Sequence, residues 1–323
     1  MMERVFDPPV LARRRETEAS LGIAMALMVA LFVAAPFVVY PIFLMKALCF
    51  ALFACAFNLL IGYVGLASFG HALFFGWASY FTAYAAKSWG WPPELAVILG
   101  AVAAGLLGVI AGTLAIRRQG IYFAMITLAL AQMMYFFALE AKFTGGEDGI
   151  QGVPRGRLFG VFDLSHEMTM YAFVLVVVVA GILFIYRIIH SPFGEVLKAI
   201  RENEQRCVSL GFRTERYKLV AFILSATLAG LAGSMKALVF QLASLTDVHW
   251  TMSGDVLLMT LLGGLGTMLG PVVGAFVVIA MQNYLAPFGQ WVLVIQGAIF
   301  VVCVLLFRRG IIGELAHFLR IRL

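Results

Sequence analysis

Histidine and cysteine are the side chains of this sequence that most often bind metals or act in catalysis. The five histidines are far apart, and the sequence contains no HExxH motif. The four cysteines form no CxxC pair, and three of them lie in apolar tracts, where cysteine is a small packing residue. We therefore expect no catalytic residue, no metal site and no cofactor bound by this chain.

The glycine-rich stretch LLGGLGTMLG at 261–270 is a second candidate, because glycine-rich loops can bind phosphate groups. It lacks the GK[ST] ending of a phosphate-binding loop, and it lies inside an uncharged tract rather than between a strand and a helix. The sequence therefore offers this chain no means of hydrolysing ATP itself. Gly264, Gly266 and Thr267 instead suggest an unwound segment beside a translocation path.

Polar side chains inside the apolar tracts are almost all neutral. Asn58, Ser68 and His71 are candidates for the translocation path, with an interhelical hydrogen bond as the alternative role of each. Lys46 and Lys236 lie near predicted helix ends, from which a lysine can extend to the membrane surface. The shortage of ionisable groups at span centres argues against a carrier driven by protons or sodium.

The elements that position these side chains must be membrane helices. Of the 323 residues, 63% are hydrophobic and only 12% are charged, about half the charged share of soluble domains. The mean hydropathy of +0.98 therefore excludes a soluble enzyme and favours a protein embedded in a bilayer. The net charge of +6 fits the excess of lysine and arginine on the cytoplasmic side of membrane proteins, so we expect no nucleic-acid partner.

The uncharged tracts predict an all-α, polytopic bundle of about 8–10 transmembrane helices. The tract at 256–307 must fold back on itself, and Pro271 and Pro287 divide it into three segments, the first of which is short enough to be re-entrant instead. Small residues four positions apart, such as Ala104 and Gly108, predict close helix packing. The predicted spans are 21–40, two within 47–86, 95–116, 120–139, 168–186, 219–241, 255–269, 271–286 and 290–307.

Lysine and arginine predict the orientation, with the N-terminus and the C-terminus both in the cytoplasm. This arrangement places 17 of the 23 basic residues on the cytoplasmic side. The expected domains are a cytoplasmic N-terminal segment (1–20), a transmembrane domain (21–307) and a cytoplasmic tail (308–323). The transmembrane domain includes an external loop at 140–168 and a cytoplasmic loop at 188–218.

The cytoplasmic loop is expected to contain one helix of about 19 residues, with Ser191 as N-cap, Pro192 at the first position and Gly211 at the end. One face of this helix is apolar and is bordered by both signs of charge, as a docking surface for a cytosolic partner would be. The apolar residues of that face are Val196, Leu197 and Ile200. A solvated connector is the alternative.

Four stretches of the sequence, in this order, resemble the LivM-type permease subunits of branched-chain amino-acid ABC importers. They are NLLIGYVGLASFGHALFFGWASY at 58–80, TGGEDGIQGVPR at 144–155, KLVAFILSATLAGLAGSM at 218–235 and LLGGLGTMLGPVVGA at 261–275. The resemblance implies a bacterial inner-membrane permease that forms half of a pore for leucine, isoleucine or valine. Its partners would be a second permease subunit, two cytosolic ATPase subunits that use ATP, and an extracytoplasmic solute-binding protein.

The same resemblance implies that the helix at 192–210 couples the permease to an ATPase. The residues carried over from the family's coupling loop are Arg201, Glu202, Glu204 and Gly211, whereas Arg206 and Cys207 stand where the family has small residues. The external loop at 140–168 would contact the binding protein. Alternatives are an importer for urea, short amides or other amino acids, a stand-alone carrier or channel, and a membrane-embedded enzyme, for which the sequence supplies no paired acid and base.

Overall fold

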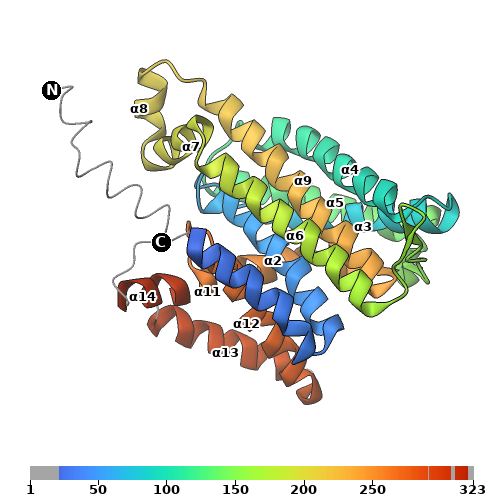
Figure 1. Ribbon diagram of the computed structural model, residues 1–323. Coiled ribbons are helices and arrows are strands. Elements are labelled where there is room, and N and C mark those ends of the chain that lie inside the picture. The colour runs from blue at the N-terminus through green and yellow to red at the C-terminus, as the bar shows by residue number, and fades with distance from the viewer. Residues whose placement is uncertain (1–21, 290, 307–309, 319–323) are drawn as a thin grey trace.

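The computed structural model describes residues 22–289, 291–306 and 310–318, and it confirms an all-α bundle (Figure 1). Five helices are long and apolar enough to cross a membrane, which is fewer than the spans predicted. They are α2 (Pro41–Ile61), α4 (Pro93–Ala115), α5 (Ile121–Glu140), α6 (Glu167–Ile189) and α9 (Thr214–Phe240). The predicted N-terminal segment at 1–20 and parts of the predicted tail, 308–309 and 319–323, lie outside the described residues.

Other helices occupy four of the five remaining predicted spans. They are the helical segment Gly22–Phe37, which ends in the 3-10 helix η2 (Ala35–Phe37), and α3 (His71–Ser88), α12 (Gly270–Leu285) and α13 (Trp291–Leu306). The predicted break within 47–86 is confirmed, because α2 ends at Ile61 and α3 begins at His71. Gly70 lies so close to α5 that an added Cβ would be 2.5 Å from the carbonyl oxygen of Thr127. The chain therefore turns back inside the bundle, where only a residue without a side chain fits.

The centre of the bundle is formed by α2, α3, α4 and α9, with α9 packed along the other three (Figure 1). Nearly every residue of α2 is buried, as expected for a helix that is apolar on all sides. The close packing predicted from small residues is confirmed, because a Cβ on Gly108 would lie 2.7 Å from the Cβ of Ala226. A Cβ on Gly230 would likewise overlap Ala104.

The last uncharged tract folds into three helices, as predicted. α11 (Trp250–Gly263) ends at Gly264, α12 begins with Gly270 and Pro271, and Pro287 lies in the 3-10 helix η5 (Ala286–Phe288) before α13. The first of these helices is shifted relative to the prediction of 255–269, because Gly264 has a φ of 124° that a helix cannot accommodate. A further short helix, α14 (Gly310–Phe318), packs against α11 and α12.

The predicted cytoplasmic helix is two helices rather than one. α7 (Pro192–Glu202) and α8 (Glu204–Ser209) are separated by Asn203, whose backbone is extended and whose side-chain oxygen accepts a hydrogen bond from the N–H of Arg206 at 2.9 Å. Asparagine is a strong N-cap residue, so it ends one helix by starting the next. The N-cap at Ser191 is confirmed, since its hydroxyl accepts from the N–H of Gly194 at 3.4 Å.

α7 and α8 lie at one end of the bundle, which we call the α7 end (Figure 1). At the opposite end, β4 (Leu242–Ala243) pairs with β1 (Ile150–Gln151), and we call this the β4 end. The predicted external loop also contains the hairpin of β2 (Arg157–Leu158) and β3 (Phe162–Asp163). The remaining short elements at this end are η3 (Lys142–Thr144), η4 (Gly146–Asp148) and α10 (Leu245–Val248).

Candidate functional site

Two groups of residues that the sequence analysis treated separately meet at the α7 end. Arg201 of α7 donates a hydrogen bond from its guanidinium to the carbonyl oxygen of Gly62, the C-cap of α2. One turn earlier in α2, Asn58 accepts from the N–H of Gly266 at 3.0 Å and donates to the carbonyl oxygen of Thr267 at 2.9 Å. We call these five residues, Asn58, Gly62, Arg201, Gly266 and Thr267, the Gly62 junction. It links α7 to the end of α2 and to the loop between α11 and α12.

Glycine and threonine fix the shape of that loop. Gly266 has a φ of 74°, which side-chain-bearing residues rarely adopt. The hydroxyl of Thr267 donates to the carbonyl oxygen of Gly264 at 2.8 Å and accepts from the N–H of Gly270 at 3.2 Å. A Cβ on Gly62 would lie 2.8 Å from the backbone nitrogen of Gly266, so the two segments touch through their backbones.

Glu204, a predicted coupling residue, is engaged within the chain. One oxygen of its carboxylate accepts from Lys218 at 2.5 Å and from Thr214 at 3.0 Å, and the other accepts from Gln119 at 2.9 Å. Lys218 is buried, so this ion pair is screened less by water and salt than one at an exposed surface. Glu204 thus holds α8 against the start of α9 and the turn between α4 and α5.

The apolar face of α7 is not the free docking surface that the sequence suggested. Leu197 and Ile200 are buried, so this face holds α7 on the bundle. The exposed apolar side chains lie instead on α8 and after it, where Val208, Leu210 and Phe212 are 55%, 71% and 40% exposed. We call these three residues the α8 patch.

The other predicted coupling residues, Glu202 and Gly211, lie before and within the α8 patch in the chain. Gly211 lies within it and has a φ of 89°. Glu202 is exposed, whereas Cys207 is buried and is not accessible to a partner.

Ser68 and His71, predicted beside the translocation path, lie in the packed interior. The hydroxyl of Ser68 accepts from the N–H of Gly70 at 3.3 Å. The Nε2 atom of His71 is 2.9 Å from the hydroxyl of Ser225, which itself donates its single hydrogen to the carbonyl oxygen of Ala56. Nε2 must therefore be the donor, and Nδ1 is buried without a hydrogen-bond partner among the described residues. Their role in a path remains a prediction.

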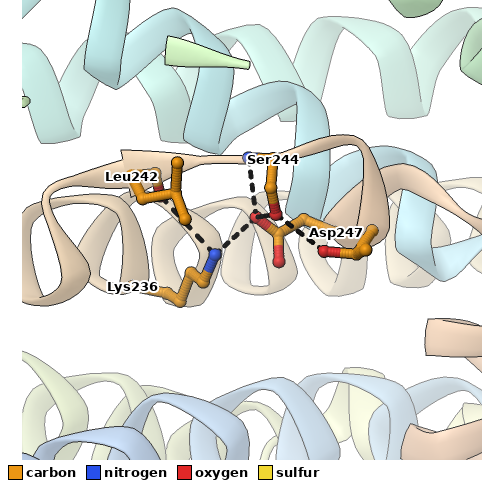
Figure 2. Close-up of polar contacts among 5 residues, drawn as sticks. Lys236, Leu242, Ser244 and Asp247 are labelled. Atoms are coloured by element: carbon orange, nitrogen blue, oxygen red, sulfur yellow. Dashed lines mark hydrogen bonds and ion pairs between the residues drawn. The ribbon is translucent and has the colours of Figure 1, made fainter. Parts of the chain in front are cut away.

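A buried ion pair at the β4 end was missed by the sequence analysis (Figure 2). The ammonium of Lys236 lies 2.6 Å from the Asp247 carboxylate, which also accepts from the N–H and the hydroxyl of Ser244 at 3.2 and 3.1 Å. Lys236 also donates to the carbonyl oxygen of Leu242 at 3.5 Å. The expectation that Lys236 reaches the membrane surface is wrong, because its charge is matched inside the protein.

The predicted external loop is held to the bundle by side chains near this ion pair. Lys87 donates to the carbonyl oxygen of Gln151 at 2.7 Å, and Arg155 donates to that of Val239 at 2.8 Å. The tip of the loop, in contrast, exposes apolar side chains, with Phe159 and Val161 at 73% and 76% exposure. The loop is therefore an anchored element with a free apolar tip.

A family model described as branched-chain amino acid transport system, permease component, matches residues 39–304. The chain belongs to this family. Together with the five apolar helices, this membership identifies a multi-pass protein of the inner membrane and confirms the LivM-type resemblance seen in the sequence. The matched region includes all five residues of the Gly62 junction, α7 and α8.

Individual relatives are similar at modest identity. The high-affinity branched-chain amino acid transport system permease protein LivM of Escherichia coli is 26% identical over 278 residues, which cover 79% of this chain and 65% of that protein. The ribose import permease protein RbsC of Bacillus subtilis is 27% identical over 225 residues, covering 67% of this chain and 69% of that protein. The matched part thus spans about two thirds of either relative. No solved structure matches this chain significantly.

Proposed function

We propose that this chain is a permease subunit of an ATP-driven importer and forms half of the translocation path for a branched-chain amino acid. The observation that supports this most directly is the Gly62 junction, in which the end of α2 is bonded both to α7, through Arg201, and to the loop between α11 and α12, through Asn58. Such a junction is what a permease needs if its energy enters through a partner at one end. In this proposal the chain is a transport subunit, and two cytosolic ATPase subunits bind and hydrolyse ATP.

The ATPase would dock at the α8 patch. Its three exposed apolar side chains are flanked in the chain by the exposed charged residues Arg206 and Arg213, and such a mixture of apolar and charged groups is typical of a protein interface. When the ATPase closes, α8 and α7 would move together, because Glu204 and the buried face of α7 fix them to the bundle. Arg201 would then shift the end of α2 and the loop at 264–267. Alternating openings would follow from tilting of these helices as rigid bodies.

This mechanism assigns the α7 end to the cytoplasm and the β4 end to the outside, as the distribution of basic residues predicts. A solute-binding protein would dock at the β4 end, against the anchored loop with Phe159 and Val161 at its tip. A second permease subunit would complete the path.

Branched-chain amino acids are the proposed solutes because the family description and the LivM relatives name them. The ribose permease has a similar identity, so the solute must be tested against a sugar. The experiment is uptake of radiolabelled leucine and ribose into proteoliposomes that contain this chain with its permease and ATPase partners, loaded with ATP and supplied with the binding protein.

We expect leucine uptake that depends on ATP and on the ATPase subunits. Uptake of ribose instead would contradict the proposed solute but not the mechanism. Uptake of leucine by this chain alone, without ATP, would contradict the proposal altogether and would establish a stand-alone carrier.

A further inference from the structure

Lys46 is an unusual residue in α2. It lies on the second turn of the helix between Met45 and Ala47, both fully buried, and is itself half-buried. Among the described residues its ammonium has no hydrogen-bond or ion-pair partner. An ionisable group within a membrane bundle is costly, and such groups commonly mark the path of a substrate.

A carboxylate without a cation of its own lies close by. Asp255, on the second turn of α11, is half-buried and accepts a hydrogen bond from the amide of Gln282 at 3.4 Å. Lys46 and Asp255 are near enough to interact electrostatically, but they form no ion pair within 4 Å. Lys236 is also near Lys46, and its charge is already matched by Asp247. Lys46 and Asp255 are therefore oppositely charged groups in the same part of the bundle that are not joined to each other.

A pocket of about 470 Å³ opens beside Lys46 at the β4 end. Its volume lies in the range of small-molecule sites. Asn283 and Tyr284, from the end of α12, contribute polar groups to the lining. The other walls are mostly apolar and include Ile42, Phe43 and Phe240. The pocket thus combines one cation, a few polar groups and aliphatic and aromatic walls. Asp255 does not line it, but its hydrogen-bond partner Gln282 directly precedes the lining residue Asn283.

We propose that this pocket binds the zwitterion of an α-amino acid with an apolar side chain. The carboxylate would pair with Lys46, the α-ammonium would lie on the side of Asp255 and Asn283, and the side chain would contact Ile42 and Phe43. A ligand carrying both charges would join the two groups that the protein keeps apart. This inference rests on the proposed function for its solute, and it places the first membrane contact of that solute at the end that faces the binding protein.

The test is binding of tritiated leucine to the complete transporter complex in nanodiscs of phosphatidylcholine, without binding protein or nucleotide. Leucinamide, which lacks the carboxylate, and 4-methylpentanoate, which lacks the ammonium, serve as competitors. We expect wild type to prefer leucine to each analogue by about tenfold or more, as for a charged hydrogen-bonded contact. Lys46→Met should lose the preference over leucinamide, and Asp255→Asn the preference over 4-methylpentanoate.

Two further variants keep the result interpretable. Lys46→Arg retains the cation and should therefore still prefer leucine to leucinamide. If substitutions at this position instead caused a folding defect, this preference would be lost in Lys46→Arg as well. Lys87→Met removes an exposed lysine at the same end, whose contact is with the Gln151 carbonyl, and should leave leucine affinity unchanged.

Leucine binding by Lys46→Met with wild-type affinity and wild-type preferences would overturn the proposal. So would displacement of leucine by phosphatidylglycerol added to the nanodiscs, because the pocket would then be a site for an anionic lipid headgroup. ATP-driven leucine uptake that persists in Lys46→Met would remove this inference and leave the proposed function intact. Absence of leucine uptake by wild type would instead remove the proposed solute itself.

Discussion

Removing one partner of the Lys236–Asp247 ion pair should destabilise the protein severely. In Lys236→Met the carboxylate of Asp247, which is only 2% exposed, would lose the ammonium at 2.6 Å and keep only the two hydrogen bonds from Ser244. A buried charge left without its partner costs about 3–5 kcal/mol. Loss of the pair would also loosen β4 and so the loop paired to it. The assay is unfolding in mixed micelles with increasing SDS, followed by circular dichroism.

The double variant Lys236→Met/Asp247→Asn is the matched control. Asparagine can still accept from Ser244, and no charge remains buried, so most of the stability should return, with a residual loss of about 1–2 kcal/mol. The two changes should thus be strongly non-additive, as for residues in direct contact. The reasoning is refuted if Lys236→Met is as stable as wild type, or if the double variant is less stable than Lys236→Met.

Three other substitutions test the packing and the Gly62 junction by the same unfolding assay. Gly108→Ala should lower the free energy of unfolding by about 1–3 kcal/mol, because the new methyl group would overlap Ala226. Gly254→Ala is the control and should raise the free energy of unfolding by up to about 1 kcal/mol, because the space around Gly254 is open. Equal effects of the two substitutions would contradict the packing. Asn58→Ala should lower the free energy of unfolding by about 1–3 kcal/mol for each backbone group that it leaves unpaired, at Gly266 and Thr267. It should also speed amide hydrogen exchange at 264–267. Unchanged exchange there would count against the junction.

The sequence was most informative where one physical rule dominates. Long uncharged tracts predicted the helices, and the prolines at 271 and 287 predicted where the last tract divides. Small residues four positions apart predicted close helix packing, which the structure shows between α4 and α9. These features depend on hydropathy and local backbone geometry, which are readable along the chain.

Contacts between residues far apart in the chain could not be predicted in that way. Lys236 was expected to reach the membrane surface, because nothing local shows that Asp247 folds back onto it. The cytoplasmic helix was predicted as continuous because asparagine occurs both within helices and as an N-cap, and the sequence alone does not show which role Asn203 has. Arg201, Asn58 and Gly266 were each identified, yet their meeting at one junction depends on contacts between residues 139 and 208 positions apart in the chain.

The measurement that tests the coupling mechanism most directly is the number of leucine molecules imported per ATP hydrolysed by the reconstituted complex with Arg201→Ala. We predict that this ratio falls about tenfold or more, because the lost hydrogen bond to Gly62 is charge-assisted, while ATP hydrolysis and assembly persist. Lys198→Ala, on the same helix with its ion pair to Glu195 inside α7, should keep the wild-type ratio. An unchanged ratio in Arg201→Ala would contradict coupling through the Gly62 junction.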